Sequence, residues 1–392
     1  MKKNYLENRF LYLLIFSLVL FGFYLCFIGG YGSDEDTLPM IYVFEARLRD
    51  GTFISSRFTG NPVPEIGIGF LSYYFGSWAA NSFTFLFHLI GIILIYLAFN
   101  KKVEINKFNL YVILCLSSPI LFFDNLEPID YSWAFLFFAI GAYFFSKKHF
   151  ELAILAFAFC VGSRLNFLIF CFAVIFFFNF NEKIDIKKKL IICFNIFIIS
   201  GLFYLPVWFY WGFGLEWLTA ARPLEQGLFG LFARFSYKTW IAFGLLQTFV
   251  IIYFIFNNFK NFKLKQNQLI IILIIINLLI FFYIPAELSY LQPAIIFLYL
   301  FLIKEFNRKI IFTLILLNFL NWGFNIQILE IKHRDTDPCS SKQALSASFV
   351  LKLEPGNIEK FYKTRNMINC WITDKNERGK RILEGKSTKI PK

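Results

Sequence analysis

Long apolar runs, separated by short polar segments that are mostly cationic, are the main pattern of this chain. The first run extends from about Phe10 to Ile28, which is long enough to cross a bilayer because about 20 helical residues span the hydrocarbon core. A long polar loop at 29–64 follows it, and the next run covers Ala80 to Asn100. The alternation continues to about Asn325. It predicts an all-α, polytopic membrane helix bundle of about 11 spans.

The polar segments alternate in charge, which predicts a topology. By the positive-inside rule, clusters of Lys and Arg mark cytoplasmic loops. These clusters are Lys2, Lys3 and Arg9; Lys101, Lys102 and Lys107; Lys147 and Lys148; Lys183 and Lys187 to Lys189; Lys260, Lys263 and Lys265; and Lys304, Arg308 and Lys309. The acidic or mixed loops between them are expected outside, and they are Gly29–Pro64, Phe122–Ser132, Trp211–Lys238 and Ile284–Pro293. We therefore expect a multi-pass protein of the bacterial inner (cytoplasmic) membrane, with a cytoplasmic N-terminus and the C-terminal tail outside.

Short helices are predicted in addition to the spans. Thr37–Arg49 and Glu65–Ser77 are expected to lie in the outer membrane interface. The first of them has a partly apolar face made by Leu38, Ile41, Phe44, Ala46 and Leu48. Phe150–Phe180 is too long for one span and predicts two short helices that meet near Gly162–Arg164. Residues 1–326 are expected to form the transmembrane domain, and residues 327–392 an external tail that folds as a small cap.

Composition agrees with a membrane protein and excludes other classes. The chain is 58% hydrophobic, contains 56 phenylalanines and has a mean hydropathy of +0.59, which is more apolar surface than a soluble core of this length needs. The net charge of +13 lies in the short topological clusters, so nucleic acid is not an expected partner. Nucleotide-binding loops and zinc-ligand spacings are missing from the sequence.

The cysteines fall into two groups. Five of the seven cysteines lie inside apolar runs and are expected to be small core residues. Cys339 and Cys370 lie alone in the tail, where an oxidising outer compartment would let them form a disulfide.

Two acidic clusters in outer loops are candidates for chemistry. Asp34, Glu35 and Asp36 directly follow the first span, and a second cluster between later spans contains Asp124, Glu127 and Asp130. A carboxylate at the membrane surface can accept the proton of an acceptor hydroxyl as a general base. A group of carboxylates can also hold a divalent cation over a phosphate leaving group, although the sequence assigns no metal ligands. The alternative is that these acids are solvated loop charges.

Lys and Arg residues in the predicted outer loops are exceptions to the positive-inside rule, so we expect them to have a role other than setting topology. They are Arg47, Arg49, Arg57, Arg164, Arg222, Arg234 and Lys238. The guanidinium fork matches phosphate oxygens, so phosphate is a strong candidate ligand. Arg164 lies between two apolar helices, where an unpaired charge is costly, and its alternative role is a structural ion pair with a nearby carboxylate. Glu287 and Tyr290 lie in a predicted outer turn, where they could recognise a lipid head group or a sugar. The alternative is that this turn is an ordinary tight loop.

Several of these features resemble the GT-C class of integral-membrane glycosyltransferases over about residues 10–325. The resemblance rests on Asp34-Glu35 after the first span, on the helical first loop, on the helix pair around Arg164 and on the turn Glu287–Pro293. Leu165 follows Arg164, where such enzymes often have Pro. The resemblance implies a polyprenyl-phosphate sugar as donor, inversion at the sugar carbon, and Asp34 as the base with Glu35 or Asp36 assisting.

The sequence therefore predicts transfer of a sugar from a polyprenyl-phosphate donor to a lipid or glycan acceptor on the outer face of the membrane. Arg164, Arg222 and Arg234 are expected to bind the donor phosphate. The expected substrate contacts are Asp124, Asp130, Glu287 and Tyr290. Two alternatives stay open. An O-antigen or polysaccharide polymerase or ligase would rely on outer-loop arginines, whereas a transporter or flippase would need polar groups in mid-span.

Overall fold

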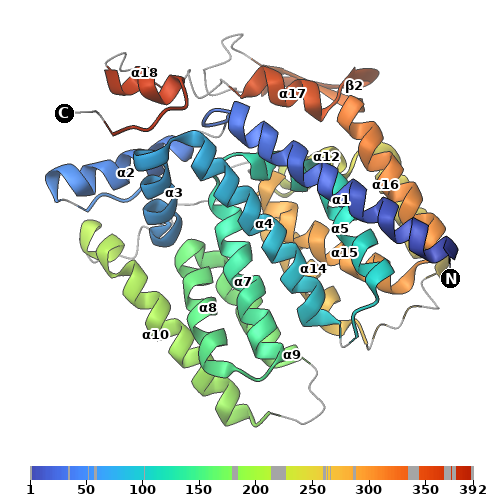
Figure 1. Cartoon of the computed structure of the whole chain (residues 1–392), viewed down its shortest axis with the longest axis horizontal. Coiled ribbons are helices and arrows are strands. Elements are labelled where there is room, and N and C mark those ends of the chain that lie inside the picture. Colours follow the sequence, from blue (N-terminus) through green and yellow to red (C-terminus); the bar gives the residue numbers. More distant parts are fainter. Residues whose placement is uncertain are drawn as a thin grey trace.

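The computed structural model describes residues 2–33, 36–51, 53–56, 60–100, 102–178, 184–212, 227–258, 262, 264, 266–285, 288–333, 344–365, 372 and 377–389. This part of the chain is mostly helical, as predicted (Figure 1). It departs from the all-α expectation at a two-stranded antiparallel hairpin formed by β1 (Phe324–His333) and β2 (Ala344–Pro355). Both strands lie in the segment that begins where the last apolar helix ends.

Four helical segments of the described chain are long and apolar enough to cross a membrane. They are Asn8–Ile28 in α1 (Lys2–Ile28), α4 (Ser77–Phe99), α10 (Ile186–Tyr210), and η4 (Leu288–Leu291) continued by α15 (Gln292–Glu305). The number rises to six if two sharply bent pairs each count as one span. The bent pairs are α5 (Ile105–Ser117) with α6 (Pro119–Phe123) and η1 (Asp124–Leu126), and α12 (Gly227–Phe243) with α13 (Leu245–Asn258). The predicted count of about 11 spans is not confirmed.

The remaining apolar helices are shorter. They are α7 (Asp130–Ser146), α8 (Phe150–Ser163), η2 (Leu165–Phe167), α9 (Leu168–Phe177), α14 (Gln268–Tyr283) and α16 (Arg308–Gly323). The predicted pair of short helices in 150–180 is confirmed, because α8 and α9 meet at an extended Arg164 followed by the single turn η2.

Local chemistry explains the two sharp bends. The 81° bend between α5 and α6 occurs at Ser118, which is extended because Pro119 follows it and starts the next helix. The 98° bend between α12 and α13 occurs at Gly244, whose φ of +76° is a left-handed conformation that glycine adopts without steric cost. Each bend turns a helix sharply within the bundle.

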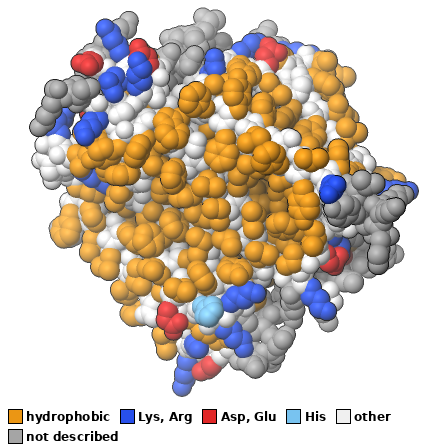
Figure 2. Space-filling model, viewed as in Figure 1, with side chains coloured by type: hydrophobic (Ala, Val, Ile, Leu, Met, Phe, Trp, Pro, Cys, Tyr) orange, Lys and Arg blue, Asp and Glu red, His pale blue; other side chains and the backbone are white. Residues whose placement is uncertain are grey.

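The core is aromatic and continuous through the bundle. Phe85, Phe138, Phe157 and Phe297, from four different helices, are fully buried in one hydrophobic cluster. The five cysteines of the apolar runs are all buried and free, as predicted. Hydrophobic side chains also cover most of the face seen in Figure 2, with charged side chains gathered toward its upper and lower edges. An apolar outer surface of this kind is expected where lipid tails are the solvent.

Segments next to three of the predicted cationic loops, near residues 99, 178 and 304, are linked to one another at one end of the bundle. Lys304 Nζ donates to Phe99 O at 2.9 Å, and Lys189 Nζ donates to Phe176 O at 2.9 Å. Phe99 in turn packs on Phe178, with ring centroids 6.0 Å apart. Segments far apart in the sequence are thereby joined at this end. Which side of the membrane it faces stays a prediction.

The first predicted outer loop contains the two short helices expected there, α2 (Thr37–Asp50) and α3 (Pro62–Phe75). The predicted apolar face of α2 is buried at Leu38, Ile41 and Phe44, but Leu48 is 51% exposed. The predicted face therefore ends one turn before the helix does.

One predicted loop is partly wrong. Trp211–Lys238 was expected to be an outer loop, but residues 227–238 form the first part of α12. This segment has no proline and carries Leu and Phe at helical spacings, so it can place an apolar face against its neighbours. An amphipathic helix accommodates the charged residues Arg234 and Lys238 of this segment as well as a loop does.

The C-terminal tail lies across the end of the bundle that carries α2 and α3 (Figure 1). Its helices are α17 (Asn357–Thr364) and α18 (Glu377–Leu383). Gly385 O accepts hydrogen bonds from the backbone N–H of Ser77 at 3.0 Å and from its hydroxyl at 2.9 Å. Tyr31 donates its hydroxyl to Lys386 O at 3.1 Å, and burial raises the pKa of this hydroxyl well above its usual range. The tail therefore covers the junction between the first loop and α4.

Cys339 and Cys370 both lie outside the described residues, so the predicted disulfide stays a prediction.

We expect Gly76→Ala to loosen the tail. Gly76 has φ +90° and ψ −173°, a region that essentially only glycine occupies, and an added Cβ would lie 2.8 Å from Gly385 O. The strain should cost about 1–3 kcal/mol. Hydrogen exchange of the amides of residues 385–389 should therefore become faster. Gly51→Ala is the control, because Gly51 also has a positive φ but no atom within 4 Å of an added Cβ. Equal protection in both variants would contradict the prediction.

Candidate functional site

A buried ion pair joins two of the residues that the sequence singled out. Arg164 Nη1 lies 2.6 Å from Asp130 Oδ1, and their side chains are 7% and 3% exposed. Arg164 occupies the break after α8, and Asp130 is the first residue of α7. Burying either charge alone would be costly, so the pair fixes the end of α7 against the helix break. Asp130 is therefore not a solvated loop charge, and Arg164 does form an ion pair with a nearby carboxylate.

Two tyrosines enclose the guanidinium. The Arg164 Cζ atom lies 3.6 Å from the ring centroid of Tyr131 and 4.9 Å from that of Tyr290. The two rings are perpendicular, with centroids 5.3 Å apart. Cation–π attraction at such distances stabilises a partly desolvated guanidinium. Tyr290, predicted as a substrate contact, therefore lies directly against Arg164, predicted as a phosphate ligand.

The ion pair belongs to a longer polar network that extends into the first loop. Asn61 donates its side-chain amide to Asp130 Oδ2 and its backbone N–H to Glu65 Oε1, the second over 3.1 Å. Glu65 is fully buried and pairs with Arg47 at 2.6 Å. Ser56 adds two further bonds to Glu65, from its N–H at 3.0 Å and its hydroxyl at 2.6 Å. We call Arg47, Glu65, Asn61, Asp130 and Arg164 the buried network.

The loop with the second acidic cluster is tied to the loop with the first. Glu127 accepts from the N–H of Ser33 at 2.9 Å and from its hydroxyl at 3.2 and 3.3 Å. The Thr37 hydroxyl donates to Pro128 O at 3.3 Å. These contacts are made immediately before and after the acidic triplet at 34–36. The described residues that flank the first acidic cluster therefore contact the loop that carries the second.

A third loop joins them. The Ser289 hydroxyl donates to Asp124 Oδ2 at 3.0 Å, and the neighbouring Tyr290 lies over Arg164. Asp124 is thus linked to the turn before α15 through Ser289. Three loops predicted to be outside, together with the break at Arg164, therefore converge at one end of the bundle.

The remaining predicted site residues either lie outside the described part of the chain or lie away from the buried network. Asp34, Glu35, Arg222 and Glu287 lie outside the described residues. Asp36 is the residue before α2, where a carboxylate favours the helix N-terminus electrostatically. Arg234 is half-buried in α12 and forms no hydrogen bond or ion pair with another described residue. The structure therefore does not join Arg234 to the buried network.

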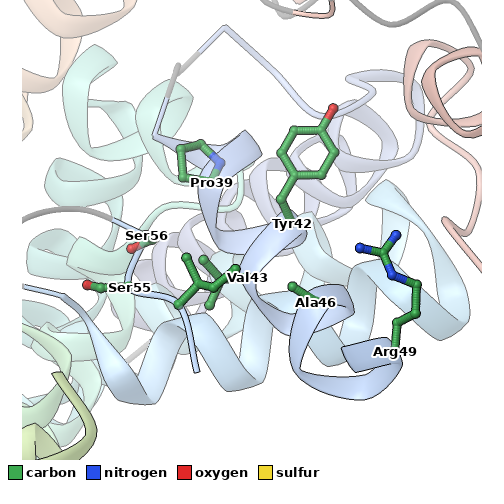
Figure 3. A pocket seen from close by; sticks show the side chains of 8 residues that line it. Pro39, Tyr42, Val43, Ala46, Arg49, Ser55 and Ser56 are labelled. Carbon is green, nitrogen blue, oxygen red and sulfur yellow. The ribbon is translucent and has the colours of Figure 1, made fainter. Parts of the chain in front are cut away.

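An open cavity of about 400 Å³ adjoins the network (Figure 3). One wall is α2, which contributes Pro39, Tyr42, Val43, Ala46 and Arg49, and the other wall is formed by residues 54–56. Ser56 lies on this wall and donates its hydroxyl to Glu65, so the cavity wall contacts the network directly. Arg49 pairs with the neighbouring Asp50 at 2.8 Å at the rim. The volume lies within the usual range for small-molecule sites.

No group of three or more potential metal ligands occurs among His, Cys, Asp and Glu of the described residues. The predicted divalent cation is therefore left open, since Asp34, Glu35 and Glu287 are outside that part of the chain.

Sequence reasoning missed Asn61, Glu65 and Tyr131. A signal was present for Glu65, because it is a carboxylate within the otherwise apolar stretch Pro62–Phe70. Such a residue in a helix that packs on the bundle is expected to be paired. Tyr131 directly follows Asp130, but nothing in the sequence indicates that its ring lies over a guanidinium from another helix.

Comparison of the chain with models of protein families, with curated protein sequences and with solved structures gives no match. Any functional inference therefore rests on the sequence pattern and on the geometry described above.

We expect Asp130→Asn to destabilise the bundle. Removing one partner of a buried ion pair leaves the other charge uncompensated, which costs about 3–5 kcal/mol. The unfolding temperature of the purified protein should fall accordingly. The double variant Asp130→Asn/Arg164→Met removes both charges and should recover much of the loss. An Asp130→Asn protein that unfolds at the same temperature as the exposed-site control Asp50→Asn would contradict this prediction.

Proposed function

We propose that this protein is a membrane glycosyltransferase of the GT-C type. It transfers a sugar from a polyprenyl-phosphate donor to a lipid or glycan acceptor on the outer face of the membrane. The observation that carries the proposal is the buried Asp130–Arg164 pair, placed where the three loops with the predicted site residues converge. Charged residues inside a membrane bundle are costly and are retained mainly where they serve a function.

The proposed reaction needs one general base. The acceptor hydroxyl oxygen attacks the anomeric carbon of the donor sugar, and the bond from that carbon to the phosphate oxygen breaks. Asp34 accepts the hydroxyl proton, and the polyprenyl phosphate leaves with the bonding electrons. The contact of Ser33, the residue before Asp34, with Glu127 supports this assignment. Glu35 or Asp36 assists by raising the basicity of Asp34 through like charge.

The donor phosphate brings negative charge that must be matched. Within the buried network, the two cations Arg47 and Arg164 balance the two carboxylates Glu65 and Asp130. Arg164 therefore contributes a fixed fork of donors rather than net positive charge. In this proposal Arg222 and Arg234 supply the additional cations, or a divalent cation held by the acidic loops does so.

Substrate contacts are assigned to the groups around the pair. Tyr290 and Asp124 would contact the donor sugar at the turn before α15, and Glu287 is assigned the same role from the sequence. The cavity along α2 offers Tyr42, Ser55 and Ser56 as hydrogen-bonding groups for the acceptor. Its position next to the buried network brings donor and acceptor to the same end of the bundle.

Mass spectrometry of envelope lipids and glycans tests the proposal. Cells that carry Asp34→Asn should lose one sugar-sized mass, as should cells with the gene deleted. The reason is that removing a general base lowers turnover by about 10²- to 10⁴-fold. Asp50→Asn is the matched control, since Asp50 is an exposed carboxylate of the same loop that pairs with Arg49. It should leave the product unchanged.

The same experiment separates the alternatives. Normal product with a stable Asp34→Asn protein would refute the assigned base. If Arg222→Ala then abolishes the product, a polymerase or ligase that relies on arginines is the better description. If only the deletion has an effect, transport becomes the better description. The described mid-bundle polar groups do not favour transport, because several of them tie helices together: Gln247 bonds Tyr299 at 2.9 Å and Asn318 bonds Ser117 at 3.0 Å.

A further inference from the structure

The cavity along α2 has two walls, and different parts of the chain hold them in place. One wall is α2 itself, and residues 54–56 form the facing wall (Figure 3). The facing wall is attached to α3, because Ser56 donates two hydrogen bonds to Glu65. It is also attached to α2, because Arg47 Nη2 donates to Ile54 O at 3.3 Å. The α2 wall has an additional support, which comes from the C-terminal tail.

Side chains of the tail form a small hydrophobic cluster with α2. We call it the tail cluster, and it consists of Ile372 and Ile382 from the tail, Leu38 and Ile41 from α2, and Tyr31 from the start of the first loop. Ile382 is 0% exposed, and Leu38 and Ile41 are 4% and 1% exposed. The tail therefore completes the burial of one face of α2.

Tyr42 connects the tail cluster to the cavity. It packs against the cluster, and it also lines the cavity, where Figure 3 shows its side chain. It directly follows Ile41 in α2, so the two residues move together when the helix moves. A shift of α2 relative to the tail therefore displaces a side chain of the cavity wall.

The tail also holds α3, the helix to which the facing wall is attached. The backbone N–H of Thr388 donates to Ser72 O at 3.3 Å, and that of Lys389 donates to Tyr73 O at 3.2 Å. The last four carbonyls of a helix have no partner inside the helix, and the tail supplies donors to two of them. The tail thus contacts both helices that determine where the cavity walls lie.

We propose that the tail is a brace that sets the separation of the two cavity walls, and that Ile382 is its positioning residue. Ile382 acts through Leu38 and Ile41, and it does not itself line the cavity. The inference concerns the shape of the cavity and holds whatever ligand the cavity accepts. One consequence rests on the proposed function: if the cavity takes the acceptor, the tail determines how the acceptor is held.

Hydrogen exchange of the full-length protein in phospholipid nanodiscs tests the brace. Ile382→Ala removes most of a fully buried side chain, so α2 should open more often, and the amides of residues 38–46 should exchange faster by about tenfold or more. Ile382→Val keeps the branched side chain and should restore most of the protection. Leu351→Ala is the matched control, since Leu351 is an isomeric side chain of the tail that is 81% exposed. Equal protection of α2 in Ile382→Ala and Leu351→Ala would overturn the proposal.

Two further readouts separate the brace from a general role in folding. Hydroxyl-radical footprinting should label Tyr42 faster in Ile382→Ala, because its contact with the tail cluster is loosened. The amides of α7 should keep their wild-type protection, because α7 contributes Phe138 and other residues to the main core and none to the tail cluster. Faster exchange of α7 as well would overturn the positioning role and make Ile382 a determinant of overall stability. None of these measurements depends on product formation, so a failure of the proposed glycosyl transfer would be seen separately.

Discussion

Arg164 has a permanent positive charge and lies between apolar helices. The arrangement of the end of the bundle where the three predicted outer loops converge depends on how that charge is compensated. Asp130 provides the opposite charge at 2.6 Å, and the rings of Tyr131 and Tyr290 cover the guanidinium. These partners come from the start of α7 and from the turn before α15. Because a desolvated charge tolerates little displacement of its partners, the pair positions both segments relative to the break after α8.

The same constraint extends into the first loop through Asn61. The side-chain amide of Asn61 donates a hydrogen bond to Asp130, and its backbone N–H donates one to Glu65. Glu65 then holds Arg47 in α2 and the N–H of Ser56. The buried network thereby links a surface helix to the interior of the bundle by alternating charges, and every member is bonded. A buried network in which each member has a charged or hydrogen-bonded partner restricts the relative movement of the segments that it joins.

The sequence predicted the parts of the fold that follow from local pattern. Apolar run lengths predicted the helical bundle, and the interruption at Gly162–Arg164 predicted two short helices. Charge alternation predicted which loops would meet. It did not reveal that Asp130 pairs with Arg164, or that Asn61 reaches a carboxylate 69 positions later in the chain, because such contacts depend on how helices pack. The helical start of α12 was missed because Trp211–Lys238 was assigned as a single loop between two cationic clusters.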